Sequence, residues 1–245
     1  MFSIFKSRVK SDLSFIGVDM HSHLLPGLDD GLKSAEDTIA FVEKLHKLGY
    51  DKLICTPHII SDLYPNNPEN INAALQLVRD ALAKKNIPVK VEAAAEYMVD
   101  AEMQKYVEEQ KPLLTFNKDF ILIEMSYIAE SRNIDSVIFN LKMRGLQPIL
   151  AHPERYNYYH SQFEKYQQFI DRGCMLQVNL LSLLGYYGKP VKAIAEKLIK
   201  SNMVTLLGTD MHHENHLAAL HELASQKDFY KLVENAGIKN KELLS

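Results

Sequence analysis

The stretch GVDMHSHLLPGLDDGLKS, residues 17–34, carries two histidines and two aspartates between an apolar run and a helix-start signal. The run itself, FIGVDM (15–20), is short and apolar, which is typical of a strand buried on both faces. Ser34 is the predicted N-cap of the following helix. His21 and His23 lie two residues apart, so both side chains point to the same side of an extended chain. The stretch therefore predicts a strand–loop–helix unit with polar side chains at the carboxyl end of its strand.

The same kind of unit recurs along the chain. Further strands are predicted at KLICT (52–56), VKVEAAA (89–95), FILIEM (120–125), PILA (148–151), MLQVN (175–179) and MVTLLG (203–208). Helical patterns are predicted at 35–49, 68–86, 131–145, 160–173 and 189–202. Strands that alternate with helices predict parallel pairing, and no glycine-rich dinucleotide loop follows any strand, which disfavours a doubly wound sheet. The predicted fold class is an α/β, TIM-like barrel of about seven β/α units in a single domain.

The chain of 245 residues is slightly acidic, with 31 acidic against 28 basic side chains. This balance gives no electrostatic case for a nucleic-acid or membrane partner. No run of about 18 apolar residues occurs, so no transmembrane segment is predicted. The sequence contains two cysteines, Cys55 and Cys174, and no secretion signal, which favours the reducing cytoplasm.

The chain is expected to divide into a short extension and one domain. Residues 1–14 are basic but lack a continuous apolar region and a cleavage site, so they are predicted to be a poorly ordered N-terminal extension. The alternative is a surface helix that contacts lipid or a partner through Phe2, Ile4 and Phe5. The domain is expected to span residues 15–245.

Ionisable side chains stand at or just beyond the carboxyl ends of all the predicted strands except the sixth, which ends in Asn179. In barrel folds these ends meet at one mouth, where sites are assembled from several strands. Imidazole and carboxylate ligands suit zinc, manganese or iron, and this number of donors suits two or three divalent ions. The candidate metal ligands are His21, His23, Asp30, His58, Glu96, Glu124, His152, Asp210 and His212.

Each candidate has an ordinary alternative when it is considered alone. A histidine at a strand end, such as His58 or His152, is commonly a hydrogen-bonded rim residue, and a single glutamate is commonly an ion-pair partner. Burying so many ionisable groups around one mouth without a cation would be very costly, which favours the metal site. Asp19 either orients a ligand from behind or is an ordinary polar strand residue.

A cysteine-based tyrosine phosphatase is disfavoured. Such an enzyme needs an activated thiolate and an arginine six positions further on. Ser61 and Leu180 stand at that spacing from Cys55 and Cys174, so both cysteines are predicted to be small apolar core residues.

The motifs DMHSHLLPGLDDG, TPH, AAEYMVD, LIEMS, AHPERY and GTDMH together resemble those of the PHP (polymerase and histidinol phosphatase) superfamily. Within it, they are most similar to the bacterial PHP-type protein tyrosine phosphatases of capsule and exopolysaccharide operons. The resemblance implies a distorted (β/α)7 barrel with two or three divalent ions, manganese first and iron or zinc as alternatives. It also implies a cytoplasmic metal-dependent enzyme that hydrolyses phosphotyrosine on the tyrosine-rich tail of a bacterial tyrosine kinase, which regulates capsular or exopolysaccharide synthesis.

The resemblance further implies roles for single residues. The ligands would divide among three ions as His21, His23 and Asp210, then Glu124 and His152 with Glu96 bridging to the first ion, then Asp30, His58 and His212. Arg155 would bind the substrate phosphate, and His58 or His212 would serve as a general acid. For Arg155 the ordinary alternative is a surface pair with Glu154.

One departure from the family pattern concerns phosphate binding. Related phosphatases often carry a second arginine several residues after Asp-x-His, but the stretch DMHHENHLAAL contains none. His213 or His216 is the expected substitute, and either is equally an ordinary helix histidine. Among the tyrosines expected near the mouth, Tyr127 is the candidate for stacking on a phosphotyrosine ring.

Two other functions remain open. A small-molecule phosphatase, such as a histidinol-phosphate phosphatase, shares the same metal site. A non-catalytic PHP scaffold is the second alternative, although such modules tend to lose ligands and this chain retains the nine candidates.

Overall fold

The computed structural model describes residues 11–245, so residues 1–10, most of the predicted extension, lie outside the described part. In the rest of that extension, Leu13 is fully buried and its N–H donates to the carbonyl of Leu48 at 2.6 Å. Leu48 is the C-cap of α1 (Ala35–Lys47). The chain is therefore already packed against the first helix at Leu13.

Strands form at every predicted apolar run. They are β1 (Val18–Asp19), β2 (Lys52–Cys55), β3 (His58–Ile59), β4 (Lys90–Ala93), β5 (Glu96–Met98), β6 (Phe120–Glu124), β7 (Gln147–Ala151), β8 (Met175–Asn179) and β9 (Leu206–Gly208). The second and third runs each break for two residues and then continue, so that β2 leads into β3 and β4 leads into β5.

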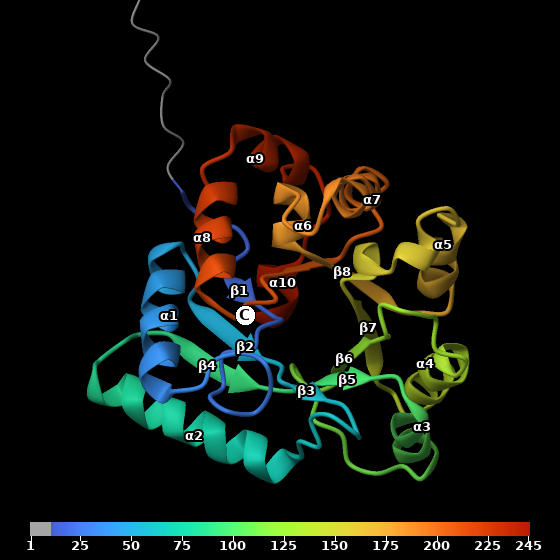
Figure 1. The fold of residues 1–245 in the computed structure, drawn as a ribbon, viewed down its shortest axis with the longest axis horizontal. Coiled ribbons are helices and arrows are strands. Elements are labelled where there is room, and N and C mark those ends of the chain that lie inside the picture. The colour runs from blue at the N-terminus through green and yellow to red at the C-terminus, as the bar shows by residue number, and fades with distance from the viewer. Residues whose placement is uncertain (1–10) are drawn as a thin grey trace, which may run out of the picture.

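Two parallel sheets form the barrel wall, in the orders β1-β2-β4 and β3-β5-β6-β7-β8-β9 (Figure 1). Because β2 and β4 continue as β3 and β5, the second sheet follows the first around the wall. Just beyond β1 and β9, Ser22 and Met211 form a parallel bridge, and the N–H of Asp210 donates to the carbonyl of His21 at 2.8 Å. The first and last strand positions are therefore neighbours, and the predicted α/β barrel is confirmed in a distorted form.

Helices surround the strands as an outer layer (Figure 1). The predicted helices are confirmed with shorter ends as α1, α2 (Pro68–Lys84), α4 (Ile134–Met143), α5 (Glu164–Asp171) and α7 (Lys189–Lys200). Helices that the sequence did not predict are α3 (Ala101–Glu108), α6 (Leu180–Leu184), α8 (Glu214–Leu223), α9 (Lys227–Val233) and α10 (Asn240–Leu244), together with 3-10 turns at Pro153–Arg155 and Asn157–Tyr159. The predicted N-cap is confirmed, because Ser34 Oγ accepts from the N–H of Asp37 at 3.1 Å. Within residues 11–245, none of the helices combines the length and the apolar character that crossing a membrane requires.

Alternation along the strands places the site at one end of the barrel. One buried apolar cluster takes a residue from each of several strands or strand ends: Ile54, Ala94, Leu122, Ile149 and Leu206. Leu244 of the C-terminal helix α10 packs into the same cluster. Glu96 and Glu124 follow Ala94 and Leu122 by two residues, so they face the same side as those apolar residues, further toward the carboxyl ends. The barrel thus holds an apolar lower layer and a charged upper layer.

Candidate metal centre

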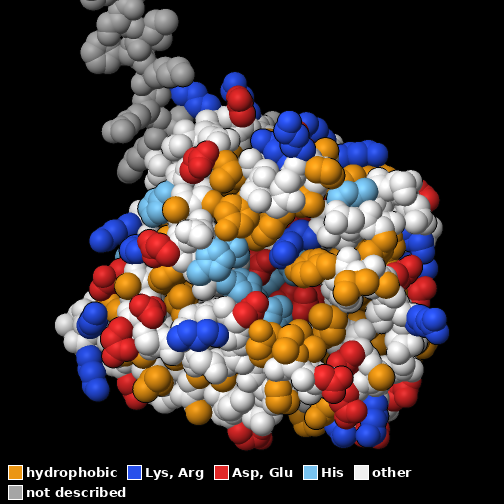
Figure 2. Space-filling view, viewed as in Figure 1, with side chains coloured by type: hydrophobic (Ala, Val, Ile, Leu, Met, Phe, Trp, Pro, Cys, Tyr) orange, Lys and Arg blue, Asp and Glu red, His pale blue; other side chains and the backbone are white. Residues whose placement is uncertain are grey.

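The nine side chains predicted as ligands converge at the mouth of the barrel. In the space-filling view, histidine and acidic side chains gather in a hollow at the centre of this face, with hydrophobic side chains around it (Figure 2). Within residues 11–245, ligand atoms lie within 4.8 Å of one another in four groups: His23, Asp30, His58 and His212; His21, His23 and Glu96; His21, His152 and Asp210; and His58, Glu96 and Glu124. Together the groups contain every one of the nine residues.

One group contains Asp30, His58 and His212, the third implied ligand set, in full, and the other groups cut across the implied division. His58 lies with Glu96 and Glu124, and His23 joins the group of Asp30. His152 lies with His21 and Asp210 rather than with Glu124 alone. The centre is therefore more compact than three separate ligand sets, and several side chains can serve more than one ion.

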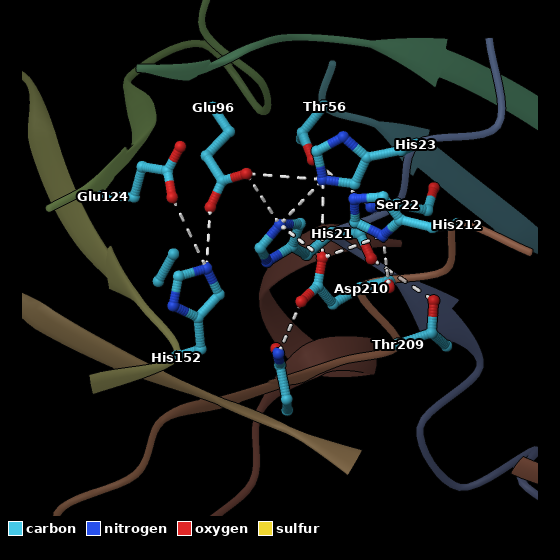
Figure 3. A network of polar contacts seen from close by, with 12 residues as sticks. His21, Ser22, His23, Thr56, Glu96, Glu124, His152, Thr209, Asp210 and His212 are labelled. Atoms are coloured by element: carbon cyan, nitrogen blue, oxygen red, sulfur yellow. Dashed lines mark hydrogen bonds and ion pairs between the residues drawn. The ribbon is translucent and has the colours of Figure 1, made fainter. Parts of the chain in front are cut away.

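Glu96, at the start of β5, lies between His152 on one side and His21 and His23 on the other (Figure 3). Its Oε2 lies 3.2 Å from His21 Nε2, 3.3 Å from His23 Nε2 and 3.0 Å from His58 Nδ1. Its Oε1 lies 3.0 Å from His152 Nε2. Burial opposes the charged form of Glu96, but His21 and His58 outweigh burial and hold the pKa of Glu96 well below its usual range. Glu96 is therefore an anion whose two oxygens face different imidazoles.

Asp210 presents its two oxygens to different partners. Oδ1 lies 3.5 Å from the Nε2 atoms of both His21 and His23, and 3.4 Å from His212 Nδ1. Oδ2 accepts hydrogen bonds from Arg155 Nη1 at 3.0 Å and from Asn179 Nδ2 at 2.7 Å. Oδ1 thus faces the imidazoles, and Oδ2 is held by Arg155 and Asn179.

Two of the nine residues have a left-handed backbone that strand and helix residues do not adopt. The φ angle is 33° at His152 and 50° at Asp210, which follow β7 and β9. Such a conformation is costly for residues other than glycine and tends to persist at functional sites, where the surrounding structure holds it. The turns bring both side chains over the centre instead of along the strand direction.

The outer part of the centre is open to solvent. Asp30 has a half-exposed side chain and lies 3.7 Å from His58 Nε2 and 3.5 Å from His212 Nε2. The His23 and His212 rings stack with their centroids 4.0 Å apart. Substrate would therefore enter on the side of Asp30, His58 and His212.

Asp29 is a site residue that the sequence did not single out. Its Oδ2 lies 2.7 Å from His23 Nδ1 and accepts from the N–H of His58 at 3.0 Å, while Oδ1 accepts from the N–H of Gly31 at 2.9 Å. Burial alone would raise the pKa of Asp29, but His23 and these hydrogen bonds lower it. Asp29 therefore orients His23 from behind, with Nε2 toward the centre. The only signal in the sequence was its place beside Asp30.

Arg155 lies in a sandwich of two tyrosine rings rather than in a surface ion pair. Its guanidinium carbon lies 4.4 Å from the ring centroid of Tyr127 and 4.2 Å from that of Tyr187. Glu154, the alternative partner, is fully buried and accepts from the N–H of Asn179 and the hydroxyl of Ser182. The alternative surface pair is therefore wrong. The sequence missed Tyr187 as a partner, because nothing in its spacing links it to Arg155.

The remaining predicted residues take other positions. Asp19 accepts from the N–H and the hydroxyl of Thr209, at 2.9 and 2.6 Å, and from the backbone N–H of His21 at 3.5 Å. His216 is buried behind the centre, with Nδ1 3.0 Å from the carbonyl of Asp210, and burial lowers the pKa of His216 to about 4. A neutral, buried imidazole does not replace the missing arginine. The ring of His213 packs against that of His216 in a tilted arrangement, with the centroids 4.0 Å apart.

The donor set fits divalent cations. Four buried atoms of the candidate ligand side chains have no hydrogen-bond partner among the described residues: His58 Nδ1, Glu96 Oε2, Glu124 Oε1 and His152 Nδ1. Buried polar atoms without a partner are rare in native structures, and bound ions are one reason for them. His58 Nδ1 lies only 2.9 Å from Glu124 Oε1 and 3.0 Å from Glu96 Oε2, so these three atoms are close enough to share one ion. Imidazole nitrogens and carboxylate oxygens at such spacing suit zinc, manganese or iron.

Residues 17–227 match the family model described as capsular polysaccharide synthesis, CpsB/CapC. The chain is 28% identical over 196 residues to the tyrosine-protein phosphatase YwqE of Bacillus subtilis, covering 80% of this chain and 77% of that protein. It is 27% identical over 202 residues to the tyrosine-protein phosphatase CpsB of Streptococcus agalactiae, covering 80% of this chain and 83% of that protein. A crystal structure from the work on YwqE of B. subtilis and CpsB of Streptococcus pneumoniae, described as unique metal-dependent tyrosine phosphatases, superposes with a TM-score of 0.80. That match has 25% identity and covers 93% of this chain and 94% of the other.

Proposed function

Because the chain belongs to the CpsB/CapC family of capsular polysaccharide synthesis, we propose that it is a metal-dependent tyrosine-protein phosphatase. The observation that carries the proposal is the compact group of nine nitrogen and oxygen donors at the barrel mouth. The relatives named as tyrosine-protein phosphatases support the substrate class, and those described as metal-dependent support the chemistry.

Two or three divalent ions would be held by His21, His23, Asp30, His58, Glu96, Glu124, His152, Asp210 and His212, with manganese as the first candidate and iron or zinc as alternatives. Bound ions of this kind polarise a phosphoryl oxygen and supply a nucleophilic water at neutral pH. The buried position of Glu96 suits a ligand shared between ions, because its two oxygens face different imidazoles.

Arg155 would bind the substrate phosphate next to the ions. Its Nη1 is used by Asp210, and no described residue accepts a hydrogen bond from its Nε or Nη2, so these N–H groups are free for a phosphate oxygen. Tyr127 and Tyr187 hold the guanidinium plane between them, which limits how far the side chain can turn. With no second arginine, this guanidinium would be the main cationic side chain that binds the substrate phosphate beside the ions.

Replacing Arg155 by Lys is expected to lower kcat/KM for a phosphotyrosine peptide by about 10- to 100-fold, chiefly through KM. A charge-assisted hydrogen bond contributes about 1.5–3 kcal/mol, and an ammonium group cannot keep both the Asp210 contact and a planar, two-point phosphate contact. Steady-state kinetics on manganese-loaded protein measure the change. The exposed Arg172, which pairs with Asp135, gives the matched control Arg172→Lys, for which no change is expected. An unchanged KM in the Arg155→Lys variant would contradict this role.

A proton donor for the leaving tyrosyl oxygen would be His58 or His212. Both lie at the open side of the centre, with about 13% of each side chain exposed. Phenolate is a fairly good leaving group, so the demand on such a donor is modest.

The substrate would be a phosphotyrosine protein, with the tyrosine-rich tail of a cytoplasmic bacterial tyrosine kinase as the specific candidate. Turnover of a phosphotyrosine peptide compared with histidinol phosphate, on the same manganese-loaded protein, tests this. We expect kcat/KM to be at least about 100-fold higher for the peptide, which corresponds to about 2.7 kcal/mol of differential transition-state binding. A preference for histidinol phosphate would assign the chain to small-molecule hydrolysis. Absence of turnover of both substrates with every divalent ion would assign it to a scaffold.

A further inference from the structure

Strand β8 ends without a candidate ligand, yet two of its side chains reach the centre. Gln177 and Asn179 are fully buried and lie two residues apart, so both point to the barrel interior. Gln177 Oε1 lies 2.9 Å from His21 Nδ1, and Gln177 Nε2 donates to Asn179 Oδ1 at 2.9 Å. Asn179 Nδ2 in turn donates to Asp210 Oδ2 at 2.7 Å. Three consecutive hydrogen bonds therefore connect two candidate ligands through two amides.

The donor-to-acceptor direction of these three hydrogen bonds follows from the carboxylate of Asp210, at which the series ends. A carboxylate only accepts hydrogen bonds, so Asn179 must turn its amide N–H₂ toward Asp210 and its oxygen toward Gln177. Gln177 must then turn its own N–H₂ toward Asn179, which leaves its oxygen facing His21. An oxygen there requires a proton on His21 Nδ1. Amide orientations are often ambiguous, but here the carboxylate at one end determines each of them.

A proton on Nδ1 leaves the lone pair of His21 on Nε2. This atom lies 3.2 Å from Glu96 Oε2 and 3.5 Å from Asp210 Oδ1, so it faces the centre. His23 has the same arrangement, because its Nδ1 is held by Asp29. The partner of His23 is a charged carboxylate, whereas the partner of His21 is a neutral amide. The amide orients the ring without adding another negative charge to the buried wall.

The surrounding structure leaves space for the Gln177 and Asn179 side chains and holds them in place. At Gly208 an added Cβ would lie 2.8 Å from both Gln177 Nε2 and His21 Cβ, so a larger residue there would push the two side chains apart. The backbone N–H of Asn179 donates to the buried Glu154 at 2.9 Å, which fixes the position of Asn179. The N–H of His152 also approaches Gln177 Oε1, at 3.4 Å.

We propose that Gln177 and Asn179 form a directional amide relay that sets His21 as the Nδ1-protonated tautomer and holds Asp210 with Oδ1 toward the ions. Both are positioning residues: they touch ligands and not the substrate. The inference rests on the proposed function, because it assumes that His21 and Asp210 bind a divalent ion.

The test compares Gln177→Met with Gln177→Glu in the full chain after chelation, with Mn²⁺ binding measured by isothermal titration calorimetry. Methionine fills a similar volume but cannot accept from Nδ1, so binding is expected to weaken about 10- to 100-fold, the usual cost of losing such a partner. Glutamate keeps an acceptor for His21 but loses the N–H₂ group that donates to Asn179 Oδ1, so binding is expected to be weaker than in the unaltered protein and tighter than in the methionine variant. A packing role predicts the reverse order, because methionine is then the milder change. Gln147→Met, a glutamine on β7 that bonds the carbonyl of Gly173, is the matched control.

A second measurement does not depend on the folding of a variant. In ¹⁵N-histidine-labelled protein loaded with Zn²⁺, long-range ¹H–¹⁵N spectra are expected to show the His21 proton on Nδ1 and the metal on Nε2. The opposite assignment, or equal Mn²⁺ affinity of the methionine variant and the unaltered protein, would overturn the relay. Failure of the unaltered protein to bind Mn²⁺ or Zn²⁺ would instead overturn the proposed function, so the two failures are distinguishable.

Discussion

Chelation of divalent ions is expected to abolish hydrolysis of a phosphotyrosine peptide, and added Mn²⁺ is expected to restore it. The loss should be at least about 10³-fold, because charge stabilisation by metal ions is worth several kcal/mol and each 1.4 kcal/mol is a factor of ten in rate. The side chains at the mouth cannot compensate, because without ions they supply neither a Lewis acid for the phosphoryl oxygens nor a metal-activated water. Initial rates before chelation, after chelation and after titration with each ion measure the effect.

The matched control for chelation is removal of both thiols. Cys55 and Cys174 are buried, and burial raises the pKa of each to about 12, so at neutral pH almost no nucleophilic thiolate is present. The variant with Cys55→Ala and Cys174→Ala is therefore expected to keep its rate within about twofold, provided it stays folded, since each truncation costs about 1 kcal/mol of stability. A thiol-free protein that is inactive, combined with full activity after chelation, would contradict the metal-dependent mechanism.

The strands were predictable because their apolar runs are buried on both faces. The run at 52–56 shows the limit of what an apolar run predicts. Its apolar residues predict one strand, but Pro57 has no N–H to donate, and the ladder changes from β2 to β3 at this point. The break after Ala93 has no comparable signal, because it follows the break in the neighbouring strand rather than any residue of its own. Local sequence therefore predicts the strands and not the division of the wall into two sheets.

The C-terminal helices were not predicted because their form depends on distant contacts. Asn240 in α10 donates to the carbonyls of Val18 and Leu207, at 3.0 and 2.7 Å, and accepts from the N–H of Leu207 at 2.9 Å. A short polar helix of this kind is marginal alone and is stabilised by packing. Helix α8 begins directly after the site, and its buried His216 interrupts the apolar pattern that would have indicated a helix.

The position of the nine polar residues at strand ends was predictable, but their mutual geometry was not. The spacing of His21 and His23 predicts a shared side, and the barrel brings the strand ends together. The left-handed turns at His152 and Asp210 have no signal, because neither residue is a glycine. Asp29 and Gln177 were missed for a related reason: a partner that orients a ligand is recognisable only when the ring nitrogen it faces is known.

Replacing Glu96 by Gln is expected to lower kcat/KM by about 10³-fold or more and to reduce the number of bound ions per chain. Glu96 contacts four imidazoles with its two oxygens, at 3.0 to 3.3 Å. Glutamine keeps the shape but supplies one acceptor, and its N–H₂ group would face nitrogen atoms whose lone pairs are needed for ions. The change also removes a negative charge from a site that must balance several cations. Metal analysis and kinetics on the manganese-reconstituted variant measure both losses together.

Glu124→Gln provides the comparison within the centre. Glu124 Oε1 lies 2.9 Å from His58 Nδ1, but Oε2 lies 3.9 Å from His152 Nε2. Glu124 therefore contacts one imidazole closely, whereas Glu96 contacts four. Its loss is expected to cost fewer ions and less activity than the loss of Glu96. Outside the centre, Glu92→Gln removes an ion-pair partner of Lys52, whose Nζ also donates to the carbonyl of Leu244, so it should leave metal content and rate unchanged. If Glu96→Gln kept its ions while Glu124→Gln lost them, Glu96 would not be the shared ligand, and the ions would lie nearer to His58 and Glu124.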